Sequence, residues 1–134
     1  MPTQLSPEMQ RRAGGHALRV VFDEATIADR VRELGHEITA AYPEGELLVL
    51  GLLKGSFIFL SDLVRQIDRP LHLDFLVASS YGTGTVSSGT VRLLYDPETP
   101  LEGKHIVIVE DIIDSGRTML KLLGLLQARN PASV

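Results

Sequence analysis

Hydrophobic residues first recur along the chain with the spacing of a helix. After Asp23 and Glu24, apolar residues follow one another at intervals of three and four, which places them on one helical face. The residues of this stripe are Ile27, Val31, Leu34 and Ile38. Pro43 and Gly45 end the pattern, because both residue types interrupt helices. The sequence therefore predicts a helix over about 23–42 with one buried face.

Strand-like and helix-like segments alternate after this helix. Residues 47–53 form an uninterrupted apolar run, which suits a strand covered on both faces. Helical spacing returns after residue 56, and residues 71–78 read as a second strand. The apolar positions of this second helix are Phe57, Leu60, Val64 and Ile67. Together these segments predict a β-α-β unit.

The middle of the chain is more polar. Residues 79–89 consist mostly of serine, glycine and threonine, so we expect a mobile loop there, followed by a returning strand over 91–95. Residues 105–109 form the strongest strand pattern, and a leucine-rich helix is predicted over 118–129. Such alternation indicates an α/β fold with a mostly parallel, twisted sheet flanked by helices, in which ligands bind at the carboxyl ends of the strands.

Length and composition fit a single soluble domain. The 134 residues are expected to form one core over 17–134 after a loose N-terminus over 1–16. The chain has no cysteine, so disulfides and thiolate metal sites are excluded. The histidines lie on separate segments without metal-ligand spacing and are interpreted as structural or solvated. They are His16, His36, His72 and His105.

Charge and hydropathy narrow the possible partners. The formal net charge is −4, which argues against a broad nucleic-acid-binding surface. An anionic ligand would instead need a local device such as backbone amides, a metal ion or one or two cations. The sequence also predicts neither a signal peptide nor a membrane-spanning segment, so we expect a soluble cytoplasmic protein.

Three carboxylates follow the strongest predicted strand. Glu110, Asp111 and Asp114 are expected to crowd one edge of the sheet, which is unfavourable unless a cation or hydroxyl groups lie between them. The sequence therefore predicts that Mg²⁺ or a polyhydroxyl ligand binds there. A solvated acidic loop is the alternative that this motif must be weighed against.

A candidate phosphate site follows the acids directly. Residues 115–118, with the sequence Ser-Gly-Arg-Thr, lead into a predicted helix whose first N–H groups are unpaired and carry partial positive charge. Gly116 allows the backbone to approach a ligand closely, and Ser115 and Thr118 add hydroxyl donors. An ordinary capped helix is the simpler alternative.

The segment EDIIDSGRT resembles the signature of type I phosphoribosyltransferases, and EDIID resembles the hypoxanthine-guanine branch. The resemblance implies a Rossmann-like core and gives each residue a role. Glu110 and Asp111 would contact the ribose hydroxyls and Mg²⁺. Asp114 would accept the proton of the purine nitrogen, and Asp114, Ser115, Gly116, Arg117 and Thr118 would enclose the 5′-phosphate.

Two further segments extend the resemblance. Leu53-Lys54-Gly55-Ser56 resembles the family's diphosphate-binding loop, in which the peptide before the lysine can be cis, so Lys54 and Gly55 are candidate diphosphate ligands. Ser80-Tyr81 resembles the start of the family's mobile lid, which closes over diphosphate and excludes water, so Ser80 and Tyr81 are further candidate diphosphate ligands.

The resemblance implies a reaction and its partners. The 5-phosphoribosyl group of phosphoribosyl diphosphate would pass to hypoxanthine or guanine, giving IMP or GMP and diphosphate, with Mg²⁺ as cofactor and a homo-oligomer, dimer or tetramer, as the assembly. Relatives continue beyond the position of Val134, so we expect the C-terminal strands and the base pocket to be missing here. The sequence is compatible with a truncation, an incomplete gene or a natural short form.

Three other classes of protein share some of these sequence features. A phosphoribosyltransferase for another base, xanthine first, shares the phosphate loop, and only the base pocket or an assay would distinguish it. A non-catalytic nucleotide-sensing module of the same fold would be expected to show a basic surface. A phosphoacceptor receiver domain would need a lysine after a later strand, whereas Lys121 lies inside a predicted helix.

Overall fold

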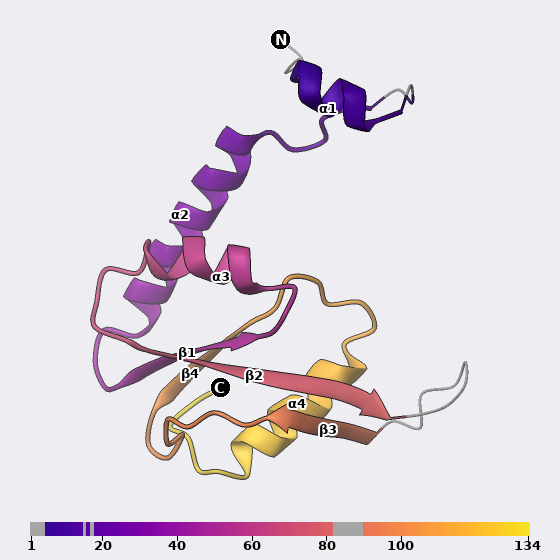
Figure 1. The fold of residues 1–134 in the computed structure, drawn as a ribbon. Coiled ribbons are helices and arrows are strands. Elements are labelled where there is room, and N and C mark those ends of the chain that lie inside the picture. Colours follow the sequence, from indigo (N-terminus) through magenta and orange to yellow (C-terminus); the bar gives the residue numbers. More distant parts are fainter. Residues whose placement is uncertain (1–4, 15, 17, 82–89) are drawn as a thin grey trace.

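The computed structural model describes residues 5–14, 16, 18–81 and 90–134, with only the backbone of residues 80, 81 and 90. The described chain contains four helices and four strands (Figure 1). In chain order they are α1 (Pro7–Arg12), α2 (Glu24–Ala41), β1 (Leu47–Leu52), α3 (Phe57–Val64), β2 (His72–Tyr81), β3 (Thr90–Tyr95), β4 (His105–Val109) and α4 (Arg117–Gln127).

The strands form one sheet in the order β3-β2-β1-β4. β1 pairs in parallel with both β2 and β4, and β2 pairs antiparallel with β3, so the expected mostly parallel sheet is confirmed. Because β1 and β4 are parallel neighbours, their carboxyl ends lie at the same edge of the sheet. The loops after these two strands are therefore brought together.

Both faces of β1 are buried, as its uninterrupted apolar run predicted. Leu48 and Leu50 pack on the side of α4, in a cluster with Leu122 and Leu126. Leu47 and Val49 point to the opposite face and pack against residues of α2 and α3. Figure 1 shows the same arrangement, with α2 and α3 on one side of the sheet and α4 on the other. Helices thus cover both faces, as expected.

The first long helix agrees with the prediction except at one position. The side chain of Asp23 caps α2 by accepting a hydrogen bond from the N–H of Thr26 at 2.8 Å. Val31 is buried, but Ile27 is 54% exposed, so its predicted place on the buried face is wrong. Ile27 belongs to the first turn of α2, and the core cluster on this face begins at Val31.

The predicted loop over 79–89 begins too early. Residues 79–81 continue β2, because Ser79 pairs with Arg92 and Ser80 with Val91 in an antiparallel ladder. Residues 82–89, the remainder of that prediction, lie outside the described part of the chain.

The predicted loose N-terminus is also wrong for Pro7–Arg12. These residues form the short helix α1, which the hydroxyl of Ser6 caps by accepting from the N–H of Met9 at 3.2 Å. None of its residues is buried, and Figure 1 shows it set apart from the sheet.

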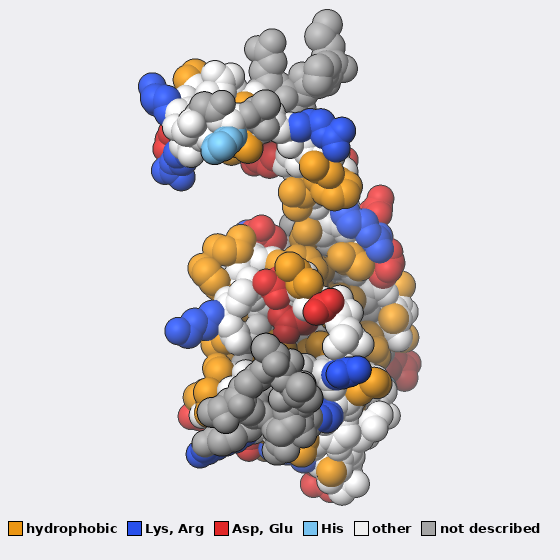
Figure 2. All heavy atoms as spheres, turned by 90° about the vertical axis from the view of Figure 1, so that its right-hand side faces the viewer, with side chains coloured by type: hydrophobic (Ala, Val, Ile, Leu, Met, Phe, Trp, Pro, Cys, Tyr) orange, Lys and Arg blue, Asp and Glu red, His pale blue; other side chains and the backbone are white. Residues whose placement is uncertain are grey.

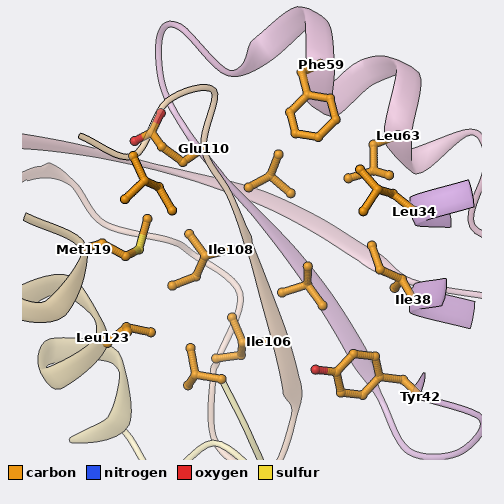
Figure 3. A pocket seen from close by; sticks show the side chains of 14 residues that line it. Leu34, Ile38, Tyr42, Phe59, Leu63, Ile106, Ile108, Glu110, Met119 and Leu123 are labelled. Carbon is orange, nitrogen blue, oxygen red and sulfur yellow. The ribbon is translucent and has the colours of Figure 1, made fainter. Parts of the chain in front are cut away.

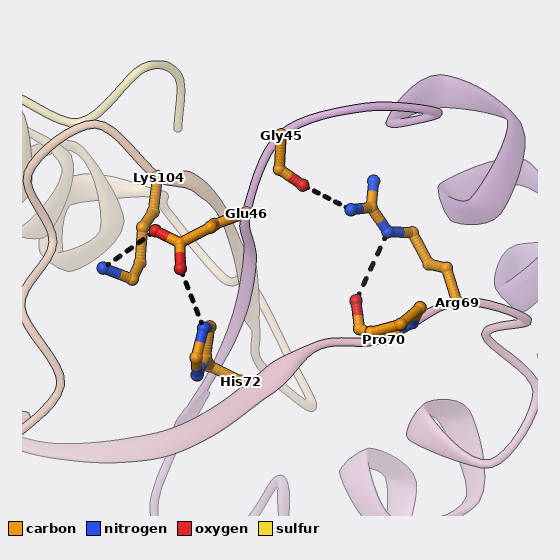
Figure 4. A network of polar contacts seen from close by, with 6 residues as sticks. All are labelled: Gly45, Glu46, Arg69, Pro70, His72 and Lys104. Carbon is orange, nitrogen blue, oxygen red and sulfur yellow. Dashed lines mark hydrogen bonds and ion pairs between the residues drawn. The ribbon is translucent and has the colours of Figure 1, made fainter.

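A polar network ties together the segments at the amino ends of the parallel strands (Figure 4). Glu46 lies 3.4 Å from both the Lys104 ammonium and the His72 ring nitrogen. The hydrogen bond with His72, and then the charge of Lys104, lower the pKa of Glu46. Arg69 donates hydrogen bonds to the carbonyls of Tyr42 and Gly45. These contacts lie at the edge opposite the carboxyl ends, and they fit the structural role predicted for His72.

Candidate active site

Two loops that are distant in sequence meet at the carboxyl ends of β1 and β4. Gly55 follows β1 and Asp111 follows β4, and an added Cβ at residue 55 would lie 2.9 Å from Asp111 Cγ and closer still to Oδ2. Figure 2 looks onto this side of the molecule and shows acidic side chains gathered near the middle of the face. The structure thus brings the predicted diphosphate loop against the predicted acidic loop.

A cavity of about 270 Å³ lies at the start of α4. Its lining contains most of the predicted phosphate and ribose residues. They are Glu110, Asp114, Ser115, Gly116 and Thr118. Arg117 does not line this cavity, and its side chain is exposed.

The backbone at the start of α4 suits an anion. Gly116 is the N-cap with φ of 75°, a left-handed conformation that favours glycine. No side chain caps the first turn by a hydrogen bond, although the hydroxyl of Ser115 accepts one from the N–H of Arg117 at 3.4 Å. Apart from this long contact of Arg117, the N–H groups of the first turn of α4 have no side-chain cap and can face a phosphate, with the helix dipole adding positive potential.

Glu110 and Asp111 form a linked carboxylate pair. Glu110 Oε1 accepts a hydrogen bond from the N–H of Asp111 at 2.9 Å, and Asp111 Oδ1 accepts one from Ile112 at 2.9 Å. Burial is the largest cause that raises the pKa of Glu110, and a side-chain hydrogen bond between the two carboxyl groups raises it further, whereas the hydrogen bond from the Asp111 N–H acts to lower it. The side-chain hydrogen bond between the carboxyl groups lowers the pKa of Asp111. The pair therefore holds a proton on Glu110 more readily than an isolated glutamate would.

The predicted crowding of three carboxylates is only partly found. Among the described residues no three acidic or histidine side chains stand close enough together to hold a metal ion. Asp114 lines the same cavity as Glu110, but it is exposed. Mg²⁺ is commonly bound by one or two carboxylates together with water and substrate oxygens. The Glu110–Asp111 pair fits that kind of site.

The loop after β1 has the predicted form. The Leu53–Lys54 peptide is cis, as the resemblance led us to expect. Ser56 is fully buried, and its hydroxyl donates a hydrogen bond to the carbonyl of Leu52 at 2.6 Å, which closes the turn. Lys54 is exposed on this loop. Ser80 and Tyr81 end β2, and the rest of the predicted lid lies outside the described residues.

The sequence did not identify the apolar part of the site. A second cavity of about 420 Å³ runs along β4 between the α2–α3 side and α4, and Figure 3 shows Glu110 at one end and Tyr42 at the other. Ile113 and Met119 line both cavities, together with Glu110. Ile112 and Ile113 are 76% and 62% exposed. The sequence did contain one indication of this apolar surface. Two isoleucines stand between carboxylates in a loop, where they cannot pack into the hydrophobic core.

Comparison with known proteins assigns the family. Residues 21–134 match the phosphoribosyl transferase domain. This chain belongs to the phosphoribosyltransferase family. It is 44% identical over 121 residues to a hypoxanthine phosphoribosyltransferase of Buchnera aphidicola, covering 89% of this chain and 68% of that protein. It is 50% identical over 119 residues to a hypoxanthine-guanine phosphoribosyltransferase of Dictyostelium discoideum, covering 86% and 66%. The resemblance to the hypoxanthine-guanine branch is confirmed.

Solved structures of the family support the fold. A crystal structure of a Staphylococcus aureus hypoxanthine phosphoribosyltransferase superposes with a TM-score of 0.81 at 39% identity, covering 86% of this chain and 62% of that one. The chain therefore spans about two thirds of the length of the relatives it matches. The expectation that relatives are longer is confirmed. No helix in the described part of the chain is long and apolar enough to cross a lipid bilayer.

Proposed function

We propose that this chain carries the phosphoribosyl-diphosphate-binding part of a Mg²⁺-dependent purine phosphoribosyltransferase that acts on hypoxanthine or guanine in purine salvage. One observation carries the proposal. The linked carboxylates of Glu110 and Asp111 lie beside a 270 Å³ cavity at the start of α4, with the Lys54–Gly55 loop against them. This arrangement offers separate places for ribose, 5′-phosphate and diphosphate within one edge of the sheet.

The residues act on different parts of the substrate. The N–H groups of the first turn of α4, with Ser115 and Thr118, bind the 5′-phosphate. Glu110 and Asp111 accept hydrogen bonds from the ribose hydroxyls and stabilise the positive charge that develops on the ribose ring. Mg²⁺, when bound by this pair, supplies positive charge for the leaving diphosphate.

The bond changes balance without a further reactant. The bond between ribose C1 and diphosphate breaks as a purine nitrogen forms its bond to C1, and Asp114 accepts the proton from the purine ring. Lys54 and the backbone at Gly55 receive the diphosphate. Ile112 and Ile113, beside the phosphate cavity, are the apolar surface on which a purine would lie.

The proposal is tested with the purified chain. Calorimetry with phosphoribosyl diphosphate and Mg²⁺ should show binding that a Glu110→Gln/Asp111→Asn variant weakens. Hypoxanthine or guanine is then added, and formation of nucleotide would show that this chain suffices for the transfer. Formation of nucleotide from xanthine alone would make xanthine, and not hypoxanthine or guanine, the base on which the enzyme acts. A folded chain that does not bind phosphoribosyl diphosphate would refute the proposed site.

Assembly and location are further proposals. We expect a homo-oligomer, dimer or tetramer, in the cytoplasm, and no binding to nucleic acid, in keeping with the net charge of −4. Sedimentation over a concentration series, cell fractionation and a mobility-shift assay with RNA test these three statements.

A further inference from the structure

Lack of space beside the carboxylate of Asp111 explains why residue 55 is a glycine. Four other described glycines adopt positive φ, where a side chain is strained, whereas Gly55 does not. They are Gly14, Gly45, Gly103 and Gly116. The backbone conformation at residue 55 therefore does not demand glycine. The restriction is one of space, because an added Cβ would overlap the carboxylate of Asp111.

The overlap is large and it involves the functional group itself. A methyl carbon at residue 55 would lie 2.9 Å from Asp111 Cγ and 3.2 Å from Oδ1, and it would be closer still to Oδ2. Carbon atoms pack at about 3.5–4 Å, so the carboxylate or the loop would have to move by roughly 1 Å. Gly124, on the exposed part of α4, has nothing within 4 Å of the same added atom.

Asp111 also makes two local hydrogen bonds. Its backbone N–H donates to Glu110 Oε1, and its own Oδ1 accepts from the N–H of Ile112. A methyl group at residue 55 would displace the carboxylate from this position and so change its distance from Glu110. The bare backbone at Gly55 thus forms one wall of the place that Asp111 occupies.

We infer that Gly55 is a positioning residue that sets the carboxylate of Asp111 for divalent-cation binding and so links the diphosphate loop after β1 to the carboxylate pair after β4. The inference rests on the proposed function, because the proposal makes Asp111 a metal and ribose ligand. It adds a second role to Gly55, whose backbone was expected only to contact diphosphate. The substitution that reports on it is the smallest available, Gly55→Ala.

A double-mutant cycle tests this role. Mn²⁺ binding, followed by electron paramagnetic resonance, is measured for the wild type, Gly55→Ala, Asp111→Ala and the double variant, with Gly124→Ala as the matched glycine control. Gly55→Ala should weaken Mn²⁺ binding about tenfold, as loss of a supporting contact around a metal ligand does. In the Asp111→Ala background the same substitution should change Mn²⁺ binding by no more than about twofold, because the clashing carboxylate is gone.

Unfolding and kinetics complete the test. Urea unfolding of the same four proteins should show that Gly55→Ala destabilises the chain only when Asp111 is present. In the nucleotide assay Gly55→Ala should raise KM for phosphoribosyl diphosphate more than it lowers kcat. An equal effect of Gly55→Ala with and without Asp111, or no Mn²⁺ binding by the folded wild type, would overturn the inference. A wild type that binds Mn²⁺ but does not bind phosphoribosyl diphosphate would refute the proposed function while leaving this cycle readable.

Discussion

Asp114 is the residue on which the proposed proton transfer depends. It is exposed at the wall of the phosphate cavity, where its carboxylate can reach a bound substrate. Asp114→Asn should lower kcat for nucleotide formation about 100-fold or more, because the amide cannot accept the purine proton. Binding of phosphoribosyl diphosphate should change far less.

The matched control for this prediction is Asp62→Asn. Asp62 pairs with Arg65 on the surface of α3, and exposed pairs of this kind contribute little to stability. Its substitution should leave both kcat and binding unchanged. Equal activity of Asp114→Asn and the wild type would exclude Asp114 as the proton acceptor.

Asp74 is a buried carboxylate that anchors the connection between β3 and β4. It is 8% exposed and accepts hydrogen bonds from the N–H groups of Phe75 at 2.7 Å and Thr99 at 2.8 Å. Burial acts to raise the pKa of Asp74, but the hydrogen bonds from Thr99, Phe75 and Glu98 together lower it. The ionised form is therefore favoured by folding.

This depressed pKa gives a pH-dependent prediction. Asp74→Asn should lower the free energy of unfolding by about 2 kcal/mol at neutral pH, because an amide cannot satisfy both N–H donors. The contribution of the ionised Asp74 is present above its ordinary pKa of 3.8 and is lost as the pH falls below that value. Urea unfolding between pH 7 and 3 should show the gap between the two proteins closing on the acid side. A gap that stays constant with pH would contradict this assignment.

Contacts between individual residues could be predicted from the sequence only where both residues lie close together along the chain. Glu110 and Asp111 are consecutive, so their pairing followed from the motif and the strand before it. The approach of Gly55 to Asp111 depends on β1 lying next to β4, and no local pattern reports that pairing. Asp74 was unpredictable for the same reason, because its partner Thr99 belongs to a distant loop.

At the level of elements, helix α4 carries one buried and one exposed leucine, whose contributions to stability can be compared. Leu122 is fully buried against the sheet, whereas Leu120 on the same helix is 70% exposed. Leu122→Ala should lower the free energy of unfolding by about 2–5 kcal/mol through lost burial and the cavity left behind. Leu120→Ala should change it by less than about 0.5 kcal/mol. Chemical unfolding monitored by circular dichroism distinguishes them, and similar losses for both variants would contradict the packing of α4.

The success of the element predictions depended on how closely local preference agreed with packing. Residues 105–109 were predicted as a strand with the bounds that the structure has, because the run is apolar and ends at acids. β2 runs to Tyr81 through serines of low strand preference, because pairing with β3 overrides local composition. The helix α1 was missed although Ser6 followed by Pro7 is a helix-start signal.

At the level of the whole molecule, the site and the fold depend on one another. The ligands of the proposed site come from the loops after β1 and β4, so the unfolded chain presents no such site. Phosphoribosyl diphosphate with Mg²⁺ should therefore stabilise the wild type by about 2.7 kcal/mol at a hundred times its Kd. Thermal unfolding should show this shift in the wild type and a smaller one in Asp111→Asn. Equal shifts in both proteins would mean that the ligand binds elsewhere.

The pairing of β1 with β4 also bears on the order in which parts of the chain fold. Leu47 pairs with His105, whereas α2, β1, α3 and β2 follow one another closely along the chain. Contacts between distant segments close long loops and tend to form after local ones. During refolding, amide protons of the α2–β2 region should gain protection from exchange first, and those of Ile106 and Ile108 later. The loops that form the proposed site would then come together in the last step of folding.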